Sequence, residues 1–139
     1  MNTLGDRTSN LSSLAILLAE DNPVNQKVAI RVLKLLGYQA DVVNNGQEVI
    51  KAIAEKVYDL ILMDMQMPIM DGIEATRYIR NQEAESQSHP IAIIAMTANS
   101  SEDDQLLCRN AGMNDYISKP IQIEKIKHIL HHYEMQKDQ

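Results

Sequence analysis

The sequence predicts an α/β protein with a doubly wound, five-stranded parallel sheet. Five short apolar runs alternate with five segments in which apolar residues recur at helical spacing. The first and third runs, Leu14–Ala19 and Leu60–Met63, are continuous rather than alternating, which is typical of strands buried on both faces of a sheet, whereas Tyr38–Val43 has a weaker strand pattern. The chain has 139 residues, of which 45% are apolar. This composition and length suit one domain with its own core.

Strands are expected where an apolar run is bounded by turn-forming residues. The five expected strands are Leu14–Ala19, Tyr38–Val43, Leu60–Met63, Ile91–Ala95 and Tyr116–Ser118. The five expected helices run from Asn22-Pro23 to Gly37, from Asn45-Gly46 through Ile53, over about 73–81, from Ser100 to about Asn110, and over Ile121–His132. The polar segment 82–90 is expected to be a loop.

Local signals mark the ends of these elements. Pro23 suits the first position of a helix, where its missing N–H costs no hydrogen bond. Gly37 is placed to close that helix in a left-handed conformation. Ser100 and Asp103 form a capping-box pattern at the start of a later helix. The Lys119–Pro120 bond is a candidate cis peptide.

The chain divides into one domain and two tails. Residues 1–13 are expected to be a linker or disordered tail, 14–132 the domain, and 133–139 a C-terminal tail. No segment has the pattern of a secretory signal, and the longest apolar run is far too short to span a bilayer. We therefore expect a cytoplasmic domain without membrane contact, either free or as the cytoplasmic part of a larger sensor protein.

Charge and cysteine content exclude several function classes. The net charge is −6 and no stretch is strongly basic, which argues against nucleic-acid binding through this chain. The single cysteine, Cys108, supports neither a disulfide framework nor a metal-ligand spacing. His128 and His132 are four residues apart on the last helix, but no third ligand is evident for a transition metal.

Acidic residues gather at the carboxyl ends of the expected strands, where ligands bind in open α/β sheets. Glu20 and Asp21 follow the first strand, and Asp64 ends the third. Converging carboxylates repel one another unless a hard cation relieves them, and Mg²⁺ commonly bridges carboxylates to a phosphate. The alternative is that Glu20 and Asp21 are ordinary acids near a helix start. The third acid favours a magnesium site.

Three further strand-end features suggest phosphoryl transfer. Asp64 is a candidate nucleophile, because carboxylates can form aspartyl phosphates. Thr97 ends the fourth strand and can donate a hydrogen bond to a phosphoryl oxygen. Lys119 follows the fifth strand and can neutralise charge during transfer. Each residue alone has an ordinary structural explanation, but their joint occurrence at four strand ends favours a reactive site.

Four segments resemble the response regulator receiver domains of two-component signalling. They are LLAEDNPVNQKVA, DLILMDMQMPIMDGIEATRYIR, IIAMTAN and DYISKPI, and together they span about Ser13 to His132. These segments are most similar to those of receivers attached to hybrid sensor histidine kinases. The resemblance implies a flavodoxin-like (βα)5 fold with strand order 2-1-3-4-5.

The resemblance also implies a role for each matching residue. Asp64 would be the phosphoacceptor, and Thr97 and Lys119 would contact the phosphoryl oxygens. Asp21 and Asp64 would bind Mg²⁺ directly, with Glu20 acting through water. The metal would also be bound by the backbone carbonyl of Gln66, and the side chains that influence hydrolysis would be those of Gln66 and Asn99. Tyr116 would change rotamer when Thr97 moves.

The predicted function is therefore a signalling switch. A phosphohistidine on a histidine kinase or histidine phosphotransfer domain would transfer its phosphoryl group to Asp64 in a Mg²⁺-dependent, in-line reaction. The resulting change would be a population shift that alters the face made by the fourth helix, fifth strand and fifth helix. The domain would catalyse only its own phosphorylation and dephosphorylation and would not turn over a pool of small substrates.

The sequence alone leaves three alternatives open. An aspartyl-nucleophile phosphohydrolase would have a second Asp two residues after the nucleophile, where this chain has Gln66. A nucleotide- or flavin-binding module would need a Gly-rich or Ser/Thr-rich loop after the first strand, where this chain has acids. A pseudo-receiver would bind partners without phosphorylation.

Overall fold

The computed structural model describes residues 12–98 and 101–137. Five strands form one parallel sheet in the order β2-β1-β3-β4-β5. The strands are β1 (Ile16–Ala19), β2 (Ala40–Val43), β3 (Leu60–Asp64), β4 (Ala92–Thr97) and β5 (Asp115–Ser118). The predicted fold class and strand order are both confirmed.

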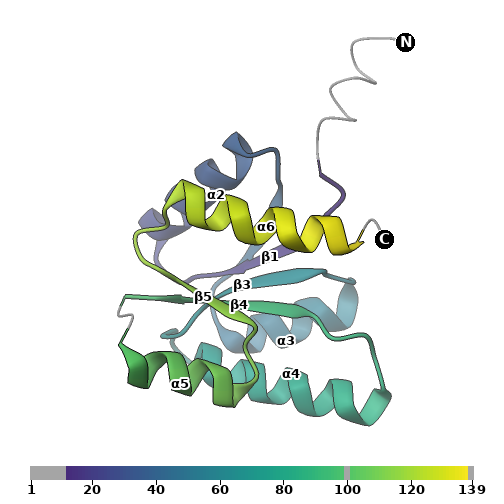
Figure 1. The fold of residues 1–139 in the computed structure, drawn as a ribbon. Coiled ribbons are helices and arrows are strands. Elements are labelled where there is room, and N and C mark those ends of the chain that lie inside the picture. The colour runs from purple at the N-terminus through teal and green to yellow at the C-terminus, as the bar shows by residue number, and fades with distance from the viewer. Residues whose placement is uncertain (1–11, 99–100, 138–139) are drawn as a thin grey trace, which may run out of the picture.

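Helices cover both faces of the sheet, so the architecture has three layers (Figure 1). The helices are α2 (Pro23–Leu35), α3 (Gly46–Glu55), α4 (Gly72–Ser86), α5 (Glu102–Ala111) and α6 (Ile123–Lys137). Helices α2 and α6 lie on one face, and α3, α4 and α5 lie on the other (Figure 1).

The continuous apolar runs are explained by this double coverage. Successive strand residues point to opposite faces, so Leu17 packs in the cluster under α3, α4 and α5, while Leu18 packs in the cluster under α2 and α6. The same division holds in β3 for Ile61 and Leu62. All four side chains are fully buried. Both faces therefore need aliphatic residues at every position.

Several predicted helix signals are confirmed. Pro23 occupies the first turn of α2, where the Asn22 side chain accepts hydrogen bonds from two backbone N–H groups. Gly37 adopts a φ of 90° just after that helix, and Asn45 caps α3. The Lys119–Pro120 peptide bond is cis.

Helix α4 is longer than predicted. The sequence indicated an end near Asn81, but the helix continues to Ser86 and closes at Gln87, whose φ is 56°. Glu83 stabilises the extra turns, because its carboxylate pairs with Arg80 at 2.7 Å and accepts the Ile91 N–H at 2.8 Å. This polar stretch lacks the apolar spacing that would have revealed a helix.

Helix α5 begins one residue later than the predicted cap implied. The cap is Ser101, whose hydroxyl accepts the Asp104 N–H at 3.2 Å. Ser100, the predicted first residue, lies outside the described part of the chain. The predicted end is confirmed, since Gly112 closes α5 with a φ of 108°.

The prediction that the last helix ends at His132 is wrong. Helix α6 continues to Lys137, where the predicted C-terminal tail would lie. Tyr133 packs against the α2–α6 core, and the Tyr38 hydroxyl donates to Glu134 at 3.1 Å. The Lys137 ammonium contacts Asp59 at 2.8 Å and the Ser13 carbonyl at 2.7 Å. These contacts, distant in sequence, stabilise turns whose own sequence is polar.

Candidate functional site

The predicted site residues lie together at the carboxyl edge of the sheet. Parallel register brings the ends of β1 and β3 side by side, since Ala19 pairs with Met63 directly before the acids. Thr97 is the last residue of β4, and its carbonyl accepts the Lys119 N–H at 2.8 Å. One cleft is lined by Glu20, Asp21, Asp64, Gln66, Thr97 and Lys119, among other residues.

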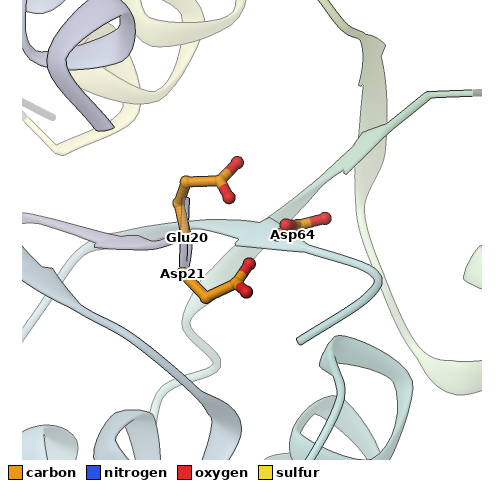
Figure 2. A group of neighbouring side chains, drawn as sticks. All are labelled: Glu20, Asp21 and Asp64. Atoms are coloured by element: carbon orange, nitrogen blue, oxygen red, sulfur yellow. The ribbon is translucent and has the colours of Figure 1, made fainter. Parts of the chain in front are cut away.

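Three carboxylates meet in this cleft. Oxygens of Glu20, Asp21 and Asp64 all lie within 4.8 Å of one another. Figure 2 shows that the Glu20 and Asp21 side chains leave the end of β1 and turn their carboxylates toward Asp64. Glu20 and Asp64 are buried, whereas Asp21 is exposed to solvent. The convergence predicted from the strand ends is therefore present.

Lys119 provides a positive charge inside the acid cluster. Its Nζ lies 2.9 Å from Glu20 Oε1 and 3.0 Å from Asp64 Oδ2. One ammonium among three carboxylates leaves an excess of negative charge. The donor set consists of hard oxygens, which is the chemistry that a small divalent cation prefers. The residues present thus fit a magnesium ion.

The electrostatics of the buried groups reflect this arrangement. Burial raises the pKa of Asp64 above its ordinary value, and the Lys119 and Gln66 hydrogen bonds only partly offset it. Burial also opposes ionisation of Glu20, but the Asn22 N–H and Lys119 lower its pKa overall. Burial likewise opposes charge on Lys119, yet its two carboxylate partners raise its pKa. Lys119 is therefore a firmly protonated cation.

The loop after β3 fixes Asp64 from its other side. Asp64 Oδ1 accepts the Gln66 N–H at 3.2 Å. The Gly72 N–H donates to the Met65 carbonyl at 3.1 Å, which brings the start of α4 against the strand end. A Cβ at position 72 would lie 2.2 Å from the Asp64 carbonyl oxygen. Only glycine permits this approach, and no local sequence pattern at position 72 predicts it.

The predicted switch residues occupy neighbouring strands. Thr97 is buried and lines the cleft. Tyr116 is half-buried against the α3–α4–α5 core and pairs with Ala95 in the β4–β5 register. The Lys125 ammonium lies 5.1 Å from the centre of the Tyr116 ring. Asn99 lies outside the described residues.

Comparison with known families decides the identity of this domain. The family model for the response regulator receiver domain matches residues 16–131. The chain belongs to this family. As a receiver domain it is a phosphorelay component of two-component signalling. The expected resemblance to receivers of hybrid histidine kinases is also confirmed by curated relatives.

Two relatives illustrate this similarity. Hybrid signal transduction histidine kinase B of Dictyostelium discoideum is 46% identical over 80% of this chain. Histidine protein kinase 1 of Candida albicans is 44% identical over 91% of it. The matches cover only 6% of the length of each of these two proteins.

Solved receiver structures agree with the fold. The receiver domain of sensor histidine kinase PA1611 from Pseudomonas aeruginosa, solved with a magnesium ion in its active-site cleft, is 42% identical with a TM-score of 0.76. The comparison covers 87% of this chain and 97% of that one. The Ssk1 receiver of Saccharomyces cerevisiae, solved with the phosphotransfer protein Ypd1, has a TM-score of 0.85 at 28% identity, covering 91% and 92% of the chains.

None of the helices in residues 12–98 and 101–137 is both long and apolar enough to cross a membrane.

Proposed function

We propose that Asp64 of this receiver accepts a phosphoryl group from a phosphohistidine in a Mg²⁺-dependent reaction. The observation that carries the proposal is the meeting of three carboxylates within 4.8 Å of one another in one cleft, with the Lys119 ammonium 3.0 Å from Asp64.

The metal would be held by the carboxylates of Asp21 and Asp64 and by the backbone carbonyl of Gln66, with Glu20 acting through water. Bound magnesium would supply positive charge against the phosphoryl oxygens. The magnesium ion in the PA1611 receiver supports this assignment, because that domain is 42% identical to this one.

The chain's own residues would carry the transfer. An Asp64 oxygen attacks phosphorus, and the bond from phosphorus to the donor imidazole nitrogen breaks. The imidazole keeps that electron pair. Lys119 stabilises the charge spread over the phosphoryl oxygens, and the Thr97 hydroxyl donates a hydrogen bond to one of them. Because Lys119 already contacts Asp64, little reorganisation is needed.

Phosphorylation would then act as the switch. It adds about two negative charges beside Lys119 and Thr97, and both residues would be drawn to the phosphoryl group. Tyr116, on the adjacent strand β5, would change rotamer as Thr97 moves. Coupling of this kind is typically about 1–3 kcal/mol and describes a population shift.

The donor would be a histidine kinase or a histidine phosphotransfer protein. Support comes from the similar Ssk1 receiver, solved with the phosphotransfer protein Ypd1, and from relatives that are histidine kinases. The domain would catalyse only its own phosphorylation and the later hydrolysis of the aspartyl phosphate. Steady turnover of a small phosphate ester would instead support a phosphohydrolase.

Phosphodonor labelling tests the proposal. A small acyl phosphate with Mg²⁺ should label the wild-type chain, and chelation of the metal should abolish labelling. Asp64→Asn should remove it completely, while the control Glu85→Gln, at an exposed position of α4, should label normally. Persistent labelling of Asp64→Asn at the wild-type level would refute the assignment.

A further inference from the structure

A glutamine on α2 holds the backbone from which two of the acids project. Gln26 Nε2 donates to the Glu20 carbonyl at 2.5 Å and to Asn44 Oδ1 at 2.9 Å. A backbone carbonyl can only accept a hydrogen bond, so the amide nitrogen must face it. Both protons of the amide are thereby used, and Gln26 links α2, the end of β1 and the loop after β2.

The loop after β2 gives this link a fixed anchor. Glu48 in the first turn of α3 accepts the Asn44 N–H at 2.8 Å and contacts the Asn44 side-chain amide at 3.4 Å. Gln26 itself is positioned by the first turn of α2, where its N–H donates to the Asn22 carbonyl at 2.9 Å. Gln26 is therefore held through its backbone by the first turn of α2 and through its side-chain amide by the loop that α3 anchors.

The hydrogen bond to the Glu20 carbonyl bears directly on Asp21. A peptide group is planar, so fixing the Glu20 carbonyl also fixes the N–H and Cα of Asp21. The Glu20 carboxylate is held independently by Lys119 and by the Asn22 N–H. Within residues 12–98 and 101–137, no hydrogen bond or ion pair holds the Asp21 carboxylate, which is exposed. Its direction depends on its backbone.

We propose that Gln26 is a positioning residue for metal binding, which aims Asp21 at Asp64 by fixing the Glu20–Asp21 peptide plane. This inference rests on the proposed function, because it takes the acid cluster to be the magnesium site. Gln26 does not touch the metal or the phosphoryl group. Groups that orient metal ligands in this way typically change metal affinity or activity by about 10- to 100-fold when mutated.

Calorimetric titration of Mg²⁺ tests the inference without using activity. Gln26→Met keeps the length of the side chain but removes the donor, and we expect it to raise the Mg²⁺ dissociation constant about tenfold. Gln47→Met makes the same change at an exposed position of α3 and should bind like wild type. Wild-type affinity in Gln26→Met would overturn the inference. Absence of binding in wild type would instead refute the proposed function.

A second variant separates positioning from charge. Gln26→Glu keeps the shape of the side chain, adds a negative charge near the cluster and places an oxygen against the Glu20 carbonyl. If charge alone mattered, this variant would bind Mg²⁺ more tightly than wild type, and that result would overturn the inference. Positioning predicts weaker binding. Circular dichroism in chelator checks that each variant is folded. If Gln26→Met does not fold, the Mg²⁺ affinity of Gln26→Glu is the measurement that tests the inference.

Discussion

Asp64 shows how a buried carboxylate lowers stability at the scale of a single side chain. It is buried at the end of β3, where Lys119 and the Gln66 N–H only partly compensate its desolvation. The folded state therefore binds the Asp64 proton more tightly than the unfolded chain does. Ionisation lowers stability above the unfolded pKa, and this penalty is relieved as pH falls.

This linkage predicts that Asp64→Asn stabilises the metal-free domain. A neutral amide removes the desolvation penalty, while Lys119 keeps its contact with Glu20. We expect the free energy of unfolding at pH 7 to rise by roughly 1 kcal/mol. The difference from wild type should shrink as pH falls through the ordinary carboxyl value near 4, because below it the carboxyl becomes protonated in both states. Denaturant unfolding in chelator, at pH 7 and at lower pH, measures the free energy of unfolding of both proteins. A variant less stable than wild type at pH 7 would contradict the prediction.

Gly72 is a second residue whose identity is set by a single contact. Gly72→Ala should force the start of α4 away from β3, because the added Cβ would lie 2.2 Å from the Asp64 carbonyl oxygen. We expect a loss of about 1–3 kcal/mol in stability and slower labelling of Asp64. Thermal unfolding and a labelling time course test this. Wild-type values for both would show that the strand end tolerates the methyl group.

At the scale of secondary-structure elements, Arg80 links helix α4 to the loop after α5. Arg80 on α4 donates to the Gly112 carbonyl at 2.8 Å and to Asn114 Oδ1 at 2.7 Å. Asn114 in turn accepts the Ile93 N–H at the start of β4. The network therefore connects α4, the loop after α5 and the sheet. The loop between α5 and β5, which this network holds, belongs to the α5–β5–α6 face that is expected to change on phosphorylation.

Removal of this network should be costly. We expect Arg80→Met to lower the free energy of unfolding by about 1–3 kcal/mol, because partly buried acceptors lose their partner. Arg77→Met, at an exposed position of the same helix, is the matched control and should stay within about 0.5 kcal/mol of wild type. Urea titrations compare the two. Equal effects would mean that Arg80 contributes no more than a surface charge.

The element scale also shows which features a sequence can predict. Continuous apolar runs placed β1, β3 and β4, since double burial leaves a local signature, whereas the edge strands β2 and β5 are only partly buried and carry weaker patterns. Local patterns could not place the ends of α4 and α6, because Glu83 and Lys137 stabilise them through partners eight or more residues away. The positions at strand ends predicted the acids, Thr97 and Lys119 as site residues. Gln26 could not be predicted in this way, because its acceptors at Glu20 and Asn44 are known only when the positions of α2 and β2 in space are known.

At the scale of the whole molecule, the two ends of the described fold are joined. Lys137 at the end of α6 contacts Ser13, which precedes β1, and Asp59, which precedes β3. Tyr38 contacts Glu134, and burial together with that carboxylate raises the pKa of Tyr38 to about 12. A raised tyrosine pKa stabilises the fold below the ordinary value near 10, and this contribution is lost as pH rises through about 12.

Truncation after His132 tests whether the last turns belong to the domain. Loss of the Tyr133 packing and the Lys137 contacts should lower the free energy of unfolding by about 2 kcal/mol. Without Glu134, ultraviolet titration should show Tyr38 ionising at lower pH than in the full chain. An unchanged free energy of unfolding and an unchanged Tyr38 titration would mean that these turns do not contribute to the stability of the domain.

We propose that the acid cluster makes Asp64, and no other residue, the acceptor of a phosphoryl group. Borohydride reduction of the chain labelled by an acyl phosphate and Mg²⁺, followed by peptide mapping, identifies the acceptor directly. We expect homoserine at position 64 alone, and none when Mg²⁺ is chelated. Homoserine at position 21, or at position 64 without metal, would contradict it.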